Sequence, residues 1–335
     1  MAKLSAEKRV KNFVGWIKPP TEKKAEVIEF KNRVKENIKN KAINDGLVVR
    51  QCPDAGSFAT DTGLRRHKLG NSDVDGQDVD LSYVVSPKDR EGEVLTYLLD
   101  KFDRYAKASY PDTKRSRSKS SIALEFESPK LKTDLVPLLD IPNSENQLLV
   151  RSDGTRRETN ISKHKDFIKR RTKRADDTSE LEFNNMIRLF KWWRCERQAD
   201  SSLEIPSFLL NLLCAHAFDN RHLKTTYLET LADWFGFLAN EIQLKKRIVF
   251  TDFTKGPGPD SKAKWEVIDP VNPSNNIVDG MAGYEIEELT EWFQSARDCI
   301  CEAIAHDEIG NESEVMEALV QVFGTAFKNN SEEEV

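Results

Sequence analysis

The stretch DVDLSYVV, residues 78–85, combines two aspartates with an apolar run and predicts a β-strand. Side chains at positions i and i+2 of a strand point to the same face, so Asp78 and Asp80 project together with their Cα atoms about 6.6 Å apart. Two carboxylates this close repel each other unless a cation lies beside them. The pair therefore indicates either a divalent metal site or an exposed acidic strand edge. Mg²⁺ favours such a small set of carboxylates.

Two further segments favour the metal site. Upstream, Gly56 and Ser57 form a small-residue turn after a short apolar run and before a predicted helix. Backbone N–H groups at such a turn bind phosphate, and glycine lets the backbone approach closely. Downstream, Asp134 is an acidic residue inside an otherwise apolar strand, which is costly unless the carboxylate is paired or bound to metal. A third carboxylate completes a site for two metal ions.

A competing D-x-D pair lies at Asp73 and Asp75, nearer to the Gly-Ser turn. Gly76 follows this pair directly, and no apolar strand continues from it, whereas Asp78 and Asp80 run straight into an apolar strand. We therefore assign the metal site to Asp78 and Asp80. We expect Asp73 and Asp75 to lie in a solvated loop.

Apolar periodicity predicts an α+β protein with two parts. The first part contains a long helix, a strand, a second helix and a β-hairpin, at residues 21–45, 79–85, 92–107, 121–126 and 132–141. Helices dominate the second part, at residues 179–196, 207–218, 225–244, 283–306 and 312–327, with one strand at 247–253. We expect a core of residues 1–158, a helical domain of residues 159–328, and a disordered acidic tail of residues 329–335.

The overall charge limits the function. A net charge of -5 over 335 residues argues against a chain whose main role is to coat nucleic acid. Basic residues still cluster at 114–119 and 169–174, where we expect loops that either are solvated or contact nucleic acid or a partner. The first residues lack an apolar leader, and no stretch of about 18 apolar residues follows, which predicts a cytosolic protein without membrane contact.

Together, the Gly-Ser turn, the D-x-D strand and the third aspartate in Thr133-Asp134-Leu135-Val136-Pro137 resemble the polymerase-β-like nucleotidyltransferases. Within them the chain is similar to the bacterial CD-NTases, or SMODS domains, which are cGAS- and DncV-like enzymes related to oligoadenylate synthase. The supporting segments are RLFKWW, IPSF and IDPVNPSNN, at residues 188–193, 205–208 and 268–276. Residues 157–161, 166–169 and 247–250 resemble clade C, with the sister clade D as the alternative.

The resemblance implies a two-lobed fold, with a mixed β-sheet palm lobe, a C-terminal helical lobe like that of oligoadenylate synthase, and the active site in the cleft between them. It implies that Asp78, Asp80 and Asp134 are catalytic and bind two Mg²⁺ ions, with Mn²⁺ as an alternative ion. It also implies a set of nucleotide-binding residues. They are Gly56, Ser57, Lys191 and Ser207 at the donor triphosphate, Phe208 on a base, and Asn275 and Asn276 at the second nucleotide.

Several of these residues have a purely structural alternative. Lys191 could be a surface lysine whose stem covers apolar groups, and Phe208 could simply be a core residue. Trp192 and Trp193 fit a core role as well. Ser207 follows a proline at a predicted helix start and could serve only the helix N-terminus.

The implied reaction joins nucleoside triphosphates, with ATP favoured, into a cyclic oligonucleotide. The expected product is a cyclic trinucleotide such as cyclic triadenylate, made for anti-phage (CBASS) signalling in bacteria. The alternatives are a cyclic dinucleotide synthase, a linear oligoadenylate or RNA-tailing enzyme, and a catalytically silent nucleotide-binding module. The resemblance also implies candidate partners, namely a HORMA-domain activator, a Trip13-like ATPase and duplex DNA. The sequence lacks a zinc-ribbon insertion like the one with which cGAS senses DNA.

Overall fold

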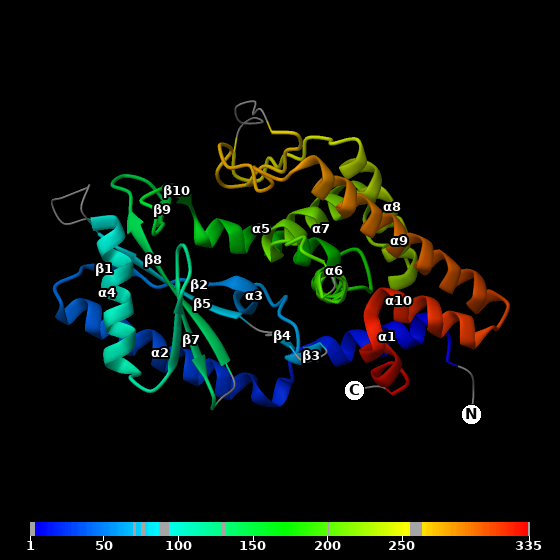
Figure 1. The fold of residues 1–335 in the computed structure, drawn as a ribbon, viewed down its shortest axis with the longest axis horizontal. Helices are drawn as coiled ribbons and strands as arrows, with labels where there is room; N and C mark the ends of the chain where they lie inside the picture. The colour runs from blue at the N-terminus through cyan, green and yellow to red at the C-terminus, as the bar shows by residue number, and fades with distance from the viewer. Residues whose placement is uncertain are drawn as a thin grey trace. The chain divides into compact units, whose positions relative to one another are not determined.

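The computed structural model describes residues 4–69, 72–74, 78–86, 94–128, 131–199, 201–254 and 263–333. The chain forms two compact units, drawn with the colours of the sequence in Figure 1. One, the sheet unit, comprises Pro19–Gly63 and Asp75–Asp166. The other, the helical unit, comprises Met1–Lys18, Leu64–Val74 and Phe167–Val335. The predicted α+β class with two lobes is confirmed.

In its described residues the sheet unit contains one mixed sheet, three complete α-helices and the start of a fourth. Its strands are β1 (Val49–Gln51), β2 (Asp54–Ala55), β5 (Asp78–Val85), β6 (Lys114–Arg117), β7 (Ile122–Phe126), β8 (Leu131–Asp140), β9 (Gln147–Val150) and β10 (Arg156–Thr159). The strand order is β1-β5-β8-β7-β6, while β2 pairs with β5, and β9 pairs with both β8 and β10. The helices are α2 (Lys24–Asn44), preceded by a 3-10 turn at Thr21–Lys23, α3 (Gly56–Ala59) and α4 (Val94–Ser109). β5 and β8 run parallel, and the other pairs are antiparallel.

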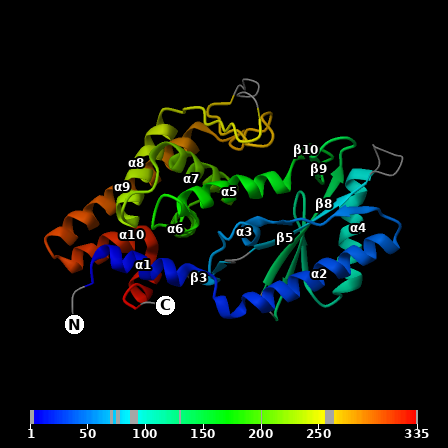
Figure 2. The ribbon, with the colours of Figure 1, turned by 180° about the vertical axis from the view of Figure 1, so that it is seen from behind.

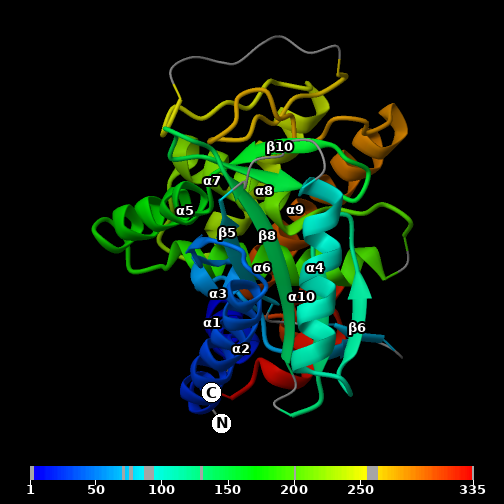
Figure 3. The ribbon, with the colours of Figure 1, turned by 90° about the vertical axis from the view of Figure 1, so that its left-hand side faces the viewer.

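Helices α2 and α4 form the core of this unit with one face of the sheet (Figures 1 and 3). Alternate residues of β5, such as Val79 and Leu81, belong to this core together with Leu135 of β8. The predicted stripe of α2 is confirmed, because Val34 and Ile38 are fully buried there. Since strand side chains alternate between faces, the residues between these core positions project from the opposite face.

The helical unit is built mainly from helices around an aromatic core. Its elements are α1 (Ala6–Ile17), β3 (His67–Leu69), β4 (Ser72–Val74), most of α5 (Ile161–Asp176), α6 (Phe183–Gln198), α7 (Ser207–Arg221), α8 (Tyr227–Gln243), α9 (Gly283–Glu308) and α10 (Glu312–Asn330). Figure 2 shows α1 beside α10. Phe13 of α1 packs against Trp192 and Phe327, with ring centroids 5.4 and 5.0 Å away. None of the helices in the described parts of the chain is both long and apolar enough to cross a membrane.

Three expectations about chain organisation differ from this structure. The first 18 residues belong to the helical unit, so the boundary is not a single point at 158/159. The predicted disordered tail begins inside α10, and the amide of Asn12 donates to the buried carbonyl of Ser331 at 3.0 Å. The predicted strand at 247–253 is only an isolated bridge between Ile248 and Val267, because no longer ladder forms beside it in the described residues.

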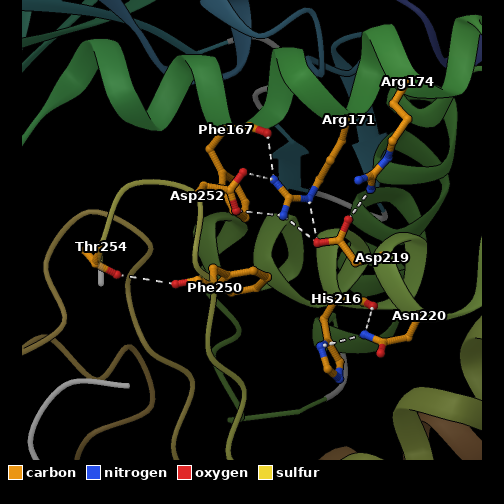
Figure 4. Close-up of polar contacts among 9 residues, drawn as sticks. All are labelled: Phe167, Arg171, Arg174, His216, Asp219, Asn220, Phe250, Asp252 and Thr254. Atoms are coloured by element: carbon orange, nitrogen blue, oxygen red, sulfur yellow. Dashed lines mark hydrogen bonds and ion pairs between the residues drawn. The ribbon is translucent and has the colours of Figure 1, made fainter. Parts of the chain in front are cut away.

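The two basic segments also differ from the expected loops. Residues 114–117 form strand β6, where Arg115 binds Asp103. Residues 169–174 lie inside α5. Figure 4 shows the Arg171 guanidinium of α5 turned toward Asp219 and Asp252, with two hydrogen bonds of 3.0 and 3.1 Å to the Asp252 carboxylate. These arginines therefore serve internal ion pairs.

Candidate active site

Two of the three predicted metal ligands lie side by side. Strand β5 runs parallel to β8 in a register that places Asp80 next to Asp134 and Asp78 next to Lys132. Neighbouring strands are about 4.8 Å apart, and partner residues in a parallel pair point to the same face. Both aspartates alternate with core residues, so they project from the face opposite α2 and α4. Only the backbone of Asp78 is described, and it occupies the position two residues before Asp80.

The surroundings of Asp134 affect its ionisation. Burial raises the pKa of the Asp134 carboxyl above its ordinary value, while the charge of Lys132 and a hydrogen bond from Ser121 act in the opposite direction. The Ser121 hydroxyl donates to Oδ1 of Asp134 at 3.2 Å. A desolvated carboxylate beside a second carboxylate is stabilised by a bound cation. This arrangement favours a metal-binding role for the pair.

The Gly-Ser turn begins directly beside Asp80. Ala55 of β2 is the register partner of Asp80, and Gly56 follows it as the first residue of α3. Gly56 has a φ of +72°, a conformation that favours glycine. The turn is closed by a hydrogen bond of 2.9 Å from the Thr62 N–H to the Ser57 carbonyl. The predicted phosphate turn thus begins beside the strand that carries the predicted metal ligand Asp80.

The donor set fits a hard divalent cation, because carboxylate oxygens are the ligands that Mg²⁺ prefers. Among the side chains that the structure describes, no group of three His, Cys, Asp or Glu residues is arranged to hold a metal ion. The Asp78 side chain is outside that set. Asp80 and Asp134 are therefore the described part of the predicted triad.

The competing pair lies elsewhere. Asp73 belongs to β4, which forms a separate two-stranded sheet with β3 in the helical unit, so the expectation of a loop is wrong for it. Asp75 lies outside the described residues. Asp73 therefore has no place in the sheet that carries Asp80 and Asp134.

Three predicted nucleotide contacts lie in the helical unit. Lys191 is buried on α6, at 4% exposure, which argues against a surface lysine. Ser207 is exposed at the start of α7, and its hydroxyl accepts a hydrogen bond of 2.8 Å from Arg194. Phe208 is half-buried against the core. The predicted core role of Trp192 and Trp193 is confirmed, because both are fully buried.

Asn275 and Asn276 hold a loop together. The Asn276 side-chain carbonyl accepts from the N–H groups of Val267 and Val278, and its amide donates to the Trp265 carbonyl at 3.0 Å. The Asn275 amide donates to the carboxylate of Asp269, also at 3.0 Å. A role at the second nucleotide stays a prediction for both residues.

Comparison with known proteins bears on the family. A family model described as the Second Messenger Oligonucleotide or Dinucleotide Synthetase (SMODS) domain matches residues 4–173. The cyclic AMP-AMP-AMP synthase of Escherichia coli strain MS 115-1 is 31% identical over 264 residues, which are 76% of this chain and 77% of that protein. The chain belongs to the SMODS family. The CBASS oligonucleotide cyclase CdnC of E. coli strain KTE188 is 27% identical over 254 residues, 73% and 74% of the two chains.

Solved structures of CD-NTases show the same fold as this SMODS protein. E. coli MS115-1 CdnC, solved with ATP, has a TM-score of 0.78 at 24% identity, with 97% of this chain and 99% of that chain covered. The CD-NTase CdnG of Bradyrhizobium diazoefficiens, solved in complex with GTP, has a TM-score of 0.74 at 16% identity, covering 97% and 98%. The predicted placement among the CD-NTases of clade C is confirmed. The chain is a nucleotidyltransferase.

The structure shows two contacts of predicted site residues that the sequence patterns missed, one in each unit. Ser121 reaches Asp134 from the residue before β7, and Arg194 reaches Ser207 from α6. Arg194 follows Lys191 by three positions, a spacing that places both on one side of a helix. That spacing was the only sequence signal for Arg194. Nothing in the sequence pattern distinguishes Ser121 from its serine neighbours.

Proposed function

We propose that this CD-NTase condenses ATP into a cyclic oligonucleotide, a cyclic trinucleotide such as cyclic triadenylate, for CBASS anti-phage signalling. One observation carries the proposal. Asp80 is the register partner of Asp134 on one side and of Ala55 on the other, and the Gly56-Ser57 turn begins directly after Ala55. The relative named cyclic AMP-AMP-AMP synthase supports adenine as the base and three as the number of nucleotides. The CdnC structure solved with ATP supports the same substrate.

In this proposal Asp78, Asp80 and Asp134 hold two Mg²⁺ ions, or Mn²⁺ in their place. Bound divalent cations supply charge stabilisation at the transferring phosphoryl group and at the leaving pyrophosphate. Asp134 orients the attacking hydroxyl of the acceptor nucleotide and accepts its proton, and the Ser121 hydrogen bond holds the Asp134 carboxylate for that task. Catalysis rests on positioning and charge stabilisation.

The backbone of Gly56 and the hydroxyl of Ser57 bind the donor triphosphate. Lys191 contributes a point charge to the phosphates, and Ser207 donates its hydroxyl proton to them. The Arg194 guanidinium already occupies an acceptor position of the Ser207 oxygen, so the hydroxyl proton remains available for a phosphate. Phe208 stacks on a base, which contributes about 1–3 kcal/mol without reading its identity.

A HORMA-domain protein is the proposed partner. The support is a solved complex of E. coli MS115-1 CdnC with a HORMA protein, whose CdnC chain matches this one with a TM-score of 0.76 at 24% identity. A Trip13-like ATPase, duplex DNA as an activator and a cytosolic location stay predictions.

The proposal is tested with α-labelled ATP and Mg²⁺. We expect labelled oligonucleotide from the unmodified chain and none from Asp80→Asn or Asp134→Asn, because each removes one carboxylate charge from the metal site. Asp140→Asn is the matched control. Asp140 ends the same strand six residues after Asp134, about 20 Å away, and should be replaceable without loss of product. Undiminished synthesis by Asp80→Asn would refute the assignment.

A further inference from the structure

Asp54, the residue two positions before Gly56, lies between two lysines of α2. The Lys31 ammonium donates to Oδ2 of Asp54 at 2.6 Å, and the Lys35 ammonium binds Oδ1 of the same carboxylate. Lys35 also donates to the Cys52 carbonyl at 2.9 Å. The lysines are four positions apart, so they extend from one side of the helix. These hydrogen bonds therefore connect both Asp54 of β2 and Cys52 to α2.

The three side chains combine two positive charges with one negative charge, and both lysines are largely shielded from solvent. The Lys31 side chain is 6% exposed and the Lys35 side chain 15% exposed, although two ammonium groups share one carboxylate. Burial alone would raise the pKa of Asp54, but the hydrogen bonds and charges of Lys31 and Lys35 outweigh it and lower the pKa. Asp54 stays ionised, and the group of three has a net charge of one positive unit.

The same group reaches the phosphate turn directly. The Lys31 ammonium lies 5.1 Å from the ring centroid of Phe58, the residue after Ser57, in a cation–π contact. Strand β2 has only two residues, and its second residue, Ala55, is the register partner of Asp80. Two ladder pairs alone hold such a short strand weakly. The charge-assisted anchor at the half-buried Asp54 therefore determines where the turn begins relative to Asp80.

We propose that Lys31, Lys35 and Asp54 form a clamp that holds the Gly56-Ser57 turn in place for the triphosphate of a nucleotide. The inference rests on the proposed role of the turn in binding the donor triphosphate. The three residues are positioning residues, because Asp54 pairs with the core-facing Leu81 and the group therefore acts through the turn. An ion pair with a purely structural role would pair one lysine with one carboxylate and would not contact the turn, as Lys31 does through Phe58.

The chain offers such an ordinary pair as a control. The Lys101 ammonium of α4 binds the carboxylate of Asp45, the residue after α2, at 2.5 Å, and its side chain is 9% exposed. The Tyr105 hydroxyl donates to the same carboxylate oxygen at 2.6 Å. Here one lysine meets one carboxylate in the same sheet unit, between α4 and the end of α2. Lys101→Met therefore measures the loss of an ion pair between a buried lysine and an exposed carboxylate, without a change at the turn.

The test compares Lys31→Met, Lys35→Met and Lys101→Met. Binding of a non-hydrolysable ATP analogue is measured by calorimetry, KM and kcat for ATP by pyrophosphate release, and Tm by thermal unfolding. We expect Lys31→Met and Lys35→Met to raise Kd and KM about tenfold with little change in kcat, since a ground-state phosphate contact is weakened. Lys31→Arg retains the charge and should recover most of the affinity. Lys101→Met should lower Tm and leave Kd and KM unchanged.

The outcomes separate the clamp from the proposed function. If Lys31→Met lowers Tm as Lys101→Met does and leaves the Kd of the analogue unchanged, the clamp is only structural and the inference is wrong, while product formation by the unmodified chain would leave the function standing. If the unmodified chain binds no analogue, both are overturned. A weaker Kd in Lys31→Met that Lys31→Arg fails to recover would exclude the ion pair with Asp54 as the cause and overturn the inference.

Discussion

Replacing Gly56 by alanine should weaken ATP binding by a calculable amount. Gly56 has a φ of +72°, and an L residue in this left-handed region costs roughly 1–2 kcal/mol. The turn must adopt this conformation to bring its N–H groups to the triphosphate, as proposed above. Because about 1.4 kcal/mol corresponds to a factor of ten, KM for ATP should rise roughly 5- to 30-fold in Gly56→Ala.

Gly154→Ala is the matched control for backbone strain. Gly154 has a φ of +80° and lies in the same sheet unit, between β9 and β10. An added Cβ there would meet no heavy atom within 4 Å, so the substitution introduces the strain without a clash. We expect it to lower the free energy of unfolding by about 1–2 kcal/mol and to leave KM for ATP unchanged.

The assay measures the initial rate of pyrophosphate release against ATP concentration, together with urea unfolding of both variants. Strain at Gly154 should appear in the unfolding free energy, whereas the Gly56 turn can relax when no triphosphate is bound, so its strain should appear in KM. If Gly56→Ala loses as much stability as Gly154→Ala and keeps the KM of the unmodified chain, the turn does not hold the triphosphate in this conformation. That result would refute the reasoning.

Three further perturbations follow from side-chain contacts. Ser121→Ala removes a hydrogen bond that favours the ionised form of Asp134, so the pKa of Asp134 should rise. The acidic limb of the kcat/KM–pH profile should therefore move to higher pH. An unmoved limb would contradict the contact. Burial raises the pKa of Glu196 to about 7 against an ordinary 4.5, with a Trp192 hydrogen bond opposing it, so the folded chain holds an extra proton and stability should fall as pH rises from 4.5 to 7. Glu196→Gln should flatten the Tm–pH profile in that window, and an unchanged slope would show that Glu196 is not the group responsible. Gly324 in α10 has a φ of +72°, and the Glu196 carboxylate occupies the place of an added Cβ. Gly324→Ala should therefore displace this carboxylate and cost roughly 1–2 kcal/mol of backbone strain in urea unfolding; an unchanged unfolding free energy would contradict the left-handed conformation.

Elements with a strong apolar period were predictable from the sequence. Helix α2 follows the stripe of Val34 and Ile38, and β5 follows the alternation that begins at Val79, because packing against one core imposes these periods. Helix α5 escaped prediction, although it is 16 residues long. One of its buried residues is Arg171, and a basic residue at a core position interrupts the apolar periodicity from which a helix is predicted. The partners of Arg171 are 48 and 81 positions away, which no local pattern reveals.

The site shows the same division between local and distant information. The D-x-D spacing places Asp78 and Asp80 on one face within a single strand, so local geometry is sufficient. The position of Asp134 next to Asp80 depends on the register of two parallel strands more than 50 positions apart, and the anchor of Asp54 depends on a helix and a strand that meet only in the fold. Such pairings arise from packing of the whole unit. Sequence patterns therefore indicate which residues belong to the site, but only the structure shows which of them are in contact.

The product formed from ATP tests the central claim most directly. The protein is incubated with ATP and Mg²⁺, alone and in a parallel reaction with the proposed HORMA-domain partner, and the products are treated with phosphatase before their intact masses are measured. A cyclic product has no terminal phosphate, so the phosphatase leaves it intact. We predict a resistant species with the mass of three AMP units joined in a ring, and its absence from reactions of Asp80→Asn. A phosphatase-sensitive linear oligoadenylate, or no Mg²⁺-dependent product in either reaction, would contradict it.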